Sequence, residues 1–135
     1  MIILEKNMEK IREFFSHDKY AFNTGCFIED VDDCYARISL TLDERHYNAV
    51  GGVMGGVYFT IADFAFAVAS NWQQSGTVSI TSDISFIGTP KSKKIIAETQ
   101  LVKNGRTTCC YNVSVADDRG TPLAAVKIVG LHLGK

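Results

Sequence analysis

A glycine-rich turn that leads into a long apolar stretch is the feature of this sequence that most constrains the fold. Residues 51–56 read Gly-Gly-Val-Met-Gly-Gly, and the apolar run that follows to Ala69 contains one charged residue, Asp63. On a helix of 3.6 residues per turn this run is apolar on both sides, so we expect a helix that is buried all round. The glycines and the central aspartate argue against a membrane span, because a charge there costs roughly 2.5 to 3.5 kcal/mol. The stretch is predicted to be the central helix of a globular domain.

Asp63 is the residue of this stretch that needs a chemical explanation. A buried carboxylate is costly unless it finds a hydrogen-bond partner, water or a neighbouring surface. One interpretation is a structural aspartate that is bonded to a backbone amide or a serine in the core. The other is a nucleophile or general base whose pKa is raised by its apolar neighbours. The residue type alone leaves both interpretations open.

The sequence on either side of the stretch predicts an antiparallel sheet. An amphipathic helix over residues 5–16 precedes two strands of a hairpin, over residues 26–29 and 34–42. Asn104-Gly105 is a strong signal for a tight turn between two later strands. Four strands are predicted after the central helix, over residues 77–87, 95–102, 107–116 and 122–133. The order of the elements predicts an α+β fold, in which a sheet of about six antiparallel strands wraps the long helix.

Length and composition restrict the class of protein. A chain of 135 residues fits one domain, residues 1–135, and its net charge of −1 gives no electrostatic reason to bind nucleic acid. The four cysteines have no C-x-x-C spacing and the N-terminus lacks a signal-peptide pattern, so we expect a cytoplasmic protein with reduced thiols. No group of His, Cys and Asp has metal-binding spacing, so we expect no metal.

The spacing of polar residues around the turn predicts a site that is shared between two chains. Glycines at a helix start leave backbone N–H groups accessible at the positive end of the helix dipole, where an anion or a polarised carbonyl is favoured. Asp63 follows Gly55 at a distance of roughly 12 Å along the helix axis, which is too far for both to hold one reacting atom. A sheet also covers only part of a helix that is apolar all round. We therefore expect a two-fold homodimer, in which the helix start of one subunit meets Asp63 of the other.

The turn resembles the signature of hotdog-fold acyl-CoA thioesterases of the phenylacetate-pathway (PaaI-like) type. That signature reads His-x-Asn-x-x-Gly-x-x-His-Gly-Gly and continues on the helix to an Asp or Glu. This chain has His46-Tyr47-Asn48-Ala49-Val50-Gly51-Gly52-Val53-Met54-Gly55-Gly56, followed by Asp63. The strand that ends at Pro90 and the turn Lys103-Asn104-Gly105-Arg106 are also similar to the family, so the resemblance covers nearly the whole chain.

The resemblance implies a hydrolase that uses water and no cofactor other than the coenzyme A of its substrate. Asp63 is implied to act as nucleophile or as general base on the water that attacks the thioester carbonyl. The Gly55 N–H of the other subunit, supported by Gly56, is implied to polarise that carbonyl. Asn48 is implied to orient the water or the carbonyl. Ser79 matches a position where relatives keep a Ser or Thr near the nucleophile, and Thr81 is the competing assignment.

Met54 departs from the family signature, because it stands where relatives have a histidine. A thioether offers only a weak hydrogen-bond acceptor. This departure keeps open a second function, a hotdog protein that binds acyl-CoA without hydrolysing it, as sensor or scavenger. His46 is retained, and we interpret it as a turn histidine that supports Asn48. A hotdog dehydratase ranks lower, because it needs a catalytic histidine in the site.

The resemblance also implies positions for substrate contacts, and the sequence leaves alternatives for each. Arg106 and Lys103, with Lys91, Lys93 and Lys94 nearby in sequence, are implied to bind the phosphates of CoA, although lysines in turns are commonly just solvated. The acyl pocket is implied to draw on aromatic residues that are equally explained as core: Tyr58, Phe59, Phe66 and Trp72. The implied assembly is a homodimer that forms a tetramer, with no membrane partner. The sequence identifies neither the acyl group nor the tetramer arrangement.

Overall fold

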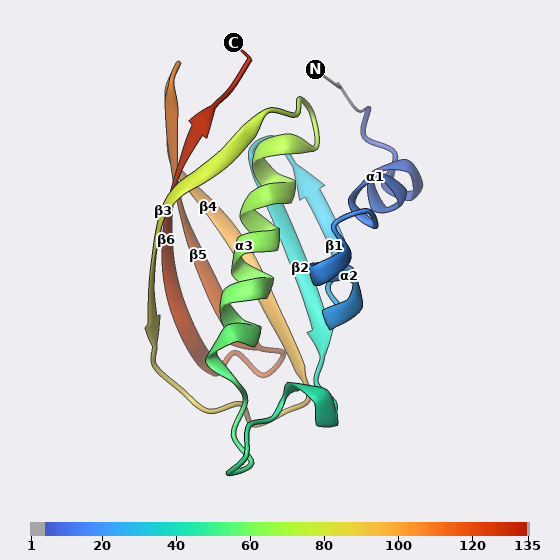
Figure 1. Ribbon diagram of the computed structural model, residues 1–135, viewed down its shortest axis with the longest axis vertical. Coiled ribbons are helices and arrows are strands. Elements are labelled where there is room, and N and C mark those ends of the chain that lie inside the picture. The colour runs from blue at the N-terminus through green and yellow to red at the C-terminus, as the bar shows by residue number, and fades with distance from the viewer. Residues whose placement is uncertain (1–4, 135) are drawn as a thin grey trace.

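The computed structural model describes residues 5–134 and contains one antiparallel sheet with helices on one side (Figure 1). Residues 1–4, on which the expected absence of a signal peptide partly rests, and residue 135 lie outside the described part. The elements follow in the order α1 (Met8–Phe15), α2 (Lys19–Thr24), β1 (Phe27–Asp32), β2 (Tyr35–Thr41), the 3₁₀ turn η1 (Glu44–His46), α3 (Gly55–Asn71), β3 (Thr77–Phe86), β4 (Lys94–Asn104), β5 (Thr108–Asp117) and β6 (Pro122–His132).

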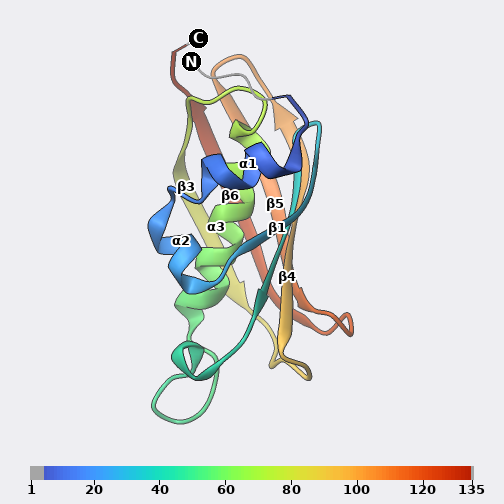
Figure 2. The same cartoon turned by 90° about the vertical axis from the view of Figure 1, so that its right-hand side faces the viewer.

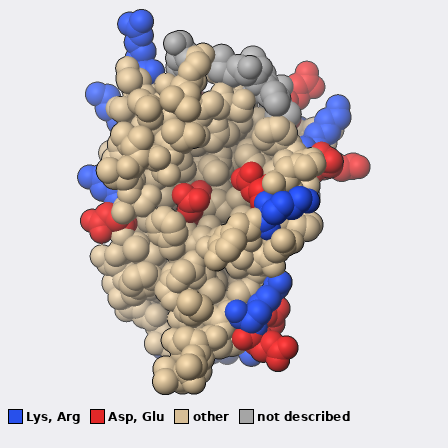
Figure 3. Space-filling model, in the orientation of Figure 1, with Lys and Arg blue, Asp and Glu red and all other residues tan. Residues whose placement is uncertain are grey.

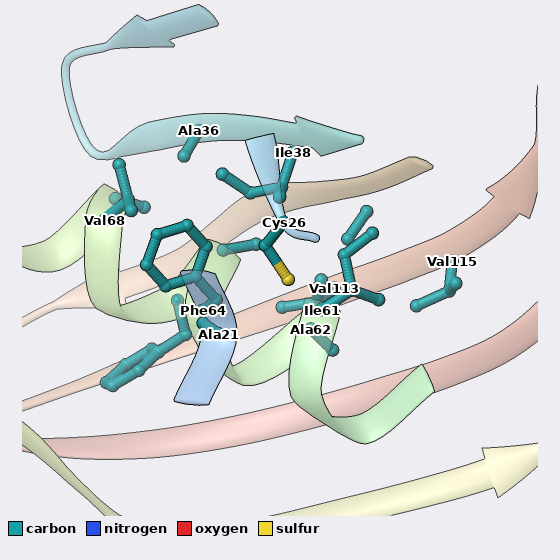
Figure 4. Close-up of a cluster of buried hydrophobic side chains, with 14 of the residues drawn as sticks. Ala21, Cys26, Ala36, Ile38, Ile61, Ala62, Phe64, Val68, Val113 and Val115 are labelled. Atoms are coloured by element: carbon teal, nitrogen blue, oxygen red, sulfur yellow. The ribbon is translucent and has the colours of Figure 1, made fainter. Parts of the chain in front are cut away.

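The sheet has the strand order β1-β2-β4-β5-β6-β3, and all its pairs are antiparallel. It curves around α3, and α1 and α2 lie on the same side, next to β1 (Figures 1 and 2). Figure 4 shows how α3 packs: Ile61 and Val68 meet Ile38 of β2 and Val113 of β5 in one apolar cluster. The predicted hotdog architecture is confirmed. None of the helices between residues 5 and 134 has the length and apolar content that crossing a bilayer requires.

The helix α3 is buried where it faces the sheet and where Phe64 packs against Phe15 of α1, but its remaining side is open, so the prediction of a helix buried all round is wrong for the single chain. Val57, Ile61 and Val68 are buried, but Phe59 is 37% exposed and Asp63 is partly exposed. The single sheet reaches only part of the helix surface. The open side of α3 is the side on which the site lies.

The helix α2 was not predicted, because a helix of six residues shows too little hydrophobic periodicity to stand out. It ends at Gly25, whose φ of 107° lies in the left-handed region that favours glycine. The strand β1 likewise extends through Asp32, into residues that were predicted to form the hairpin loop. In this part of β1, Val31 is buried and Asp30 and Asp32 point to the accessible side of the sheet. Because these two side chains are acidic, the sequence of the second half of the strand resembles that of a loop.

Candidate active site

The start of α3 presents two backbone donors that have no partner among the described residues. Met54 is the N-cap residue and its side chain makes no capping bond, while its carbonyl accepts the Val57 N–H at 3.0 Å. Within residues 5–134, the N–H groups of Gly55 and Gly56 donate to no acceptor. These two donors lie at the positive end of the helix dipole. The helix start is therefore free to bind the oxygen of a polarised carbonyl.

The two glycines at the helix start have different roles in the packing. A Cβ atom at Gly55 would lie 2.9 Å from the ring of Phe86, so glycine there allows β3 to approach α3. A Cβ atom at Gly56 would have no atom within 4 Å. The absence of a side chain at Gly56 is therefore not explained by the packing of this chain, and it leaves open space above the helix start.

Substitution of Gly56 by alanine tests whether that space receives the substrate. We expect stability to be unchanged or to rise by up to about 1 kcal/mol, because alanine favours a helix over glycine. We expect kcat/KM to fall roughly 10- to 100-fold, since the methyl group displaces the reacting carbonyl. Thermal melting and steady-state kinetics measure the two effects. Gly55→Ala is the comparison variant, in which the clash with Phe86 costs about 1 to 3 kcal/mol. Full activity in Gly56→Ala would show that nothing binds over this glycine.

Asn48 organises its own loop. Its Oδ1 accepts the N–H groups of Val50 and Gly52, each at 3.0 Å, and its backbone N–H donates to the Gly52 carbonyl at 2.7 Å. Among the described residues its side-chain amide N–H₂ group has no acceptor. Only this amide group is available for the predicted role of orienting water or a carbonyl.

His46 is 2% exposed, and its ring holds the turn and α2 together rather than supporting the side chain of Asn48. The Asp43 N–H donates to Nδ1 at 2.9 Å, so the hydrogen is on Nε2, which donates to the Thr24 carbonyl at 2.7 Å. Its backbone carbonyl accepts the Met54 N–H at 2.9 Å. The predicted structural role of His46 is therefore right in kind but has different partners.

Asp63 lies in a groove of about 500 Å³ between α3 and α2. Its carboxylate makes no hydrogen bond or ion pair with any residue from 5 to 134, so the interpretation as a structural core aspartate is wrong. Burial, and then the negative charge of Asp18, raise the pKa of Asp63. A partly buried and unpaired carboxylate with a raised pKa is typical of a general base or nucleophile. Asp18 was missed by the sequence analysis, because it is brought here by the unpredicted α2.

A second groove of about 270 Å³ leads from Met54 to the groove of Asp63. The two share Tyr20, Gly56 and Thr60, so they form one path from the helix start to the carboxylate. Met54 is 53% exposed beside this path. Figure 3 shows this face of the molecule, where acidic groups lie beside a hollow and the visible lysines and arginines lie mainly toward the rim.

The register of β3 separates Ser79 from Thr81. Ser79 pairs with Gly130, where an added Cβ would meet Phe66 of α3 at 2.7 Å, so Ser79 lies on the helix-facing side of the sheet. Thr81 pairs with Val129, the neighbour of Gly130 along β6, and therefore lies on the opposite side. A bulge between Ser79 and Thr81 causes this reversal. The two predicted residues therefore lie on opposite faces of the sheet.

The residues predicted to form the acyl pocket, and those predicted to form the basic patch, do not lie together in the structure. Three of the four aromatic residues, Tyr58, Phe66 and Trp72, are buried in the core, and only Phe59 lines the groove. The basic residues lie at the two ends of β4, which spans roughly 33 Å. The start of β4 and the residues just before it contain Lys91, Lys93 and Lys94. This end lies near the segment that precedes the glycine-rich turn, because the Lys93 ammonium is 5.6 Å from the ring centroid of Tyr47. Lys103 and Arg106 are at the other end, so a single patch of all five in one chain is wrong.

The chain is similar in sequence to known esterases and thioesterases. Residues 50–124 match the family model of the thioesterase superfamily. A putative esterase of Archaeoglobus fulgidus is 26% identical over 122 residues, which cover 89% of this chain and 79% of the relative. The acyl-coenzyme A thioesterase PaaI of Escherichia coli is 25% identical over 131 residues, which cover 96% and 89% of the two chains.

Solved structures agree with the fold. The structure of E. coli PaaI has a TM-score of 0.81 at 22% identity and covers 95% of this chain and 97% of its own. A hypothetical thioesterase of Streptococcus pneumoniae, solved with coenzyme A, also has a TM-score of 0.81, at 18% identity, and covers 90% and 98%. The chain therefore belongs to the thioesterase superfamily and is a thioester hydrolase. Within that class it has the hotdog fold and is PaaI-like.

Proposed function

We propose that this protein hydrolyses acyl-CoA thioesters with aryl or medium-chain acyl groups to the free acid and CoA. The observation that carries the proposal is the unpaired carboxylate of Asp63, in a groove that continues to the unpaired N–H groups of the α3 start. Asp63 accepts a proton from water as the water oxygen attacks the carbonyl carbon, or attacks that carbon itself. The C–S bond then breaks, and the CoA thiolate takes up a proton. Where Asp63 is the nucleophile, water then hydrolyses the acyl-aspartate anhydride, which releases the free acid and regenerates the carboxylate. No metal or cofactor takes part.

Two copies of the chain form this site. Gly55 and Asp63 are roughly 12 Å apart along α3, so one copy does not bring them to the same atom. The strand β3 is the last in the sheet, has ten residues and pairs on one side only, with β6. Its Val78 and Ile80 are exposed, and an apolar edge of this length is usually covered. Antiparallel pairing of two β3 edges about a two-fold axis makes the α3 helices antiparallel neighbours, so the start of one passes along the middle of the other.

The phosphates of CoA bind to basic groups outside the groove. Lys103 and Arg106, which make no ion pair within the described residues, are the first candidates. The relative from S. pneumoniae that was solved with coenzyme A supports a CoA-binding surface in proteins of this fold. The dimers assemble into a tetramer, as the family resemblance implies.

Met54 favours the second candidate function, binding of acyl-CoA without hydrolysis. It lies beside the Gly55 and Gly56 amides, at the position of the signature histidine, and offers only a thioether there. This function uses the same groove but predicts no free thiol.

A panel of aryl- and acyl-CoA esters separates the two functions. We expect wild-type protein to release CoA thiol, detected with a thiol reagent, and Met54→His to raise kcat by about tenfold, because the imidazole adds a hydrogen-bonding group near the thioester. Leu and Gln at position 54 are the controls, since they keep the size without a ring. Binding of the esters by calorimetry without thiol release, in wild type and in Met54→His, would contradict the hydrolase and support the binding protein.

A further inference from the structure

Asp18 has an unusual position for an aspartate at a helix start. It is the N-cap residue of α2, where a carboxylate normally accepts a backbone N–H, yet its side chain makes no capping bond. Its backbone is held on both sides, since its N–H donates to the Phe15 carbonyl at 3.0 Å and its carbonyl accepts the Phe22 N–H at 2.9 Å. The carboxylate is thus placed by a fixed backbone and has no hydrogen bond or ion pair to a described residue.

That carboxylate opens into the same groove as Asp63. The groove is lined by α3, by α2 and by the N-cap of α2, and its ionisable side chains are Asp18, Lys19, Tyr20 and Asp63. The Lys19 ammonium lies 5.9 Å from the ring centroid of Phe22 and pairs with neither carboxylate. Two acids therefore share a groove in which no cation of the described chain neutralises them.

We propose that Asp18 is a positioning residue of the thioesterase site: its unpaired carboxylate, held across the groove by α2, makes Asp63 a stronger base. This inference rests on the proposed function of Asp63. Two neighbouring carboxylates each bind a proton more tightly, because each negative charge disfavours the other. The pKa values of both carboxyl groups are raised. Burial, and then the charge of Asp18, raise the pKa of Asp63, and partial burial raises the pKa of Asp18. A general base works better as its pKa approaches the working pH.

The variant Asp18→Asn tests this role without removing a cap, because asparagine is as good an N-cap residue as aspartate. We expect the acid limb of the kcat/KM profile to move to lower pH by about half to one unit, and the plateau to fall several-fold. Asp18→Glu keeps the negative charge, so its kcat/KM profile should have its acid limb at the same pH as wild type. Asp118→Asn removes the same charge from an exposed turn between β5 and β6 and should leave the limb in place.

A titration of carboxyl ¹³C signals gives a readout that does not depend on turnover. The Asp63 signal, assigned by its loss in Asp63→Asn, should titrate at lower pH in Asp18→Asn than in wild type. An unchanged Asp63 titration and an unchanged acid limb in Asp18→Asn would overturn the inference about Asp18 and leave the proposed function intact. Full thioesterase activity in Asp63→Asn would instead overturn the proposed function, and the role of Asp18 with it.

Discussion

Asp63→Asn is expected to lower kcat by about 10²- to 10⁴-fold while the protein remains folded. An amide of the same shape neither accepts a proton from water nor attacks a carbonyl, and the wild-type carboxylate has no partner in the described chain that its loss would leave unsatisfied. Rates of CoA thiol release from the best ester of the panel measure the effect. Asp63→Glu is the matched control and should retain part of the activity, because it keeps the carboxylate. Unchanged turnover in the asparagine variant would remove Asp63 from the mechanism.

Asp63→Asn is expected to lower activity but to maintain or raise the stability of the fold at neutral pH. Since burial raises the pKa of Asp63 in the folded protein, the folded state binds its proton more tightly than the unfolded chain does. The charged form therefore destabilises the fold at pH values above the ordinary range of aspartate, and the cost disappears at lower pH, where both states are protonated. We expect the melting temperature of Asp63→Asn at pH 7 to equal or exceed that of wild type, and the difference to vanish as the pH falls below about 4. A large drop at pH 7 would indicate a structural role.

Ile80→Lys is expected to separate the proposed dimer and to reduce activity by roughly 10²- to 10³-fold, the effect of losing an oxyanion donor. Ile80 is 52% exposed at the bulge of the edge strand β3, where a charge opposes pairing with a second copy. Size-exclusion chromatography with light scattering reports the mass. Activity should recover in part at high protein concentration, because the interface is weakened rather than removed.

Val102→Lys is the matched control for the edge-strand variant. Val102 is 57% exposed and also lies at a bulge, but in β4, which takes no part in the proposed pairing of two β3 strands. The same kind of change there should leave both mass and turnover near wild type. If Ile80→Lys keeps the wild-type mass and rate, two copies do not pair through β3.

The elements that were predicted correctly are those with a strong local signal. Four glycines, one aspartate and an unbroken apolar run define α3 within a few residues, and Asn104-Gly105 locates the turn between β4 and β5. Hydrophobic alternation locates the strands after α3 to within a few residues, because each has ten or eleven residues and therefore spans several periods of two. The glycines at the start of α3 and Asp63 could be identified from the sequence because they stand out from the apolar residues of this helix.

The features that were missed depend on geometry that no local pattern encodes. The bulge in β3 places Ser79 and Thr81 on opposite faces although strict alternation gives them the same one. The length of β4 separates Lys94 from Lys103, which are close in sequence. Asp18 lies 45 positions before Asp63, and only the packing of α2 on α3 brings the two acids into one groove.

The hydrogen bonds of His46 link the two walls of the groove. Its ring holds the Thr24 carbonyl at the end of α2, and its own carbonyl holds the N–H of Met54 at the start of α3. The wall that carries Asp18 and the wall that carries Asp63 are thus linked at one end by a single buried residue, through its ring and its backbone carbonyl. The spacing of the two walls therefore depends on a buried residue that carries neither carboxylate, so a change at His46 alters the shape of the groove while Asp18 and Asp63 stay the same.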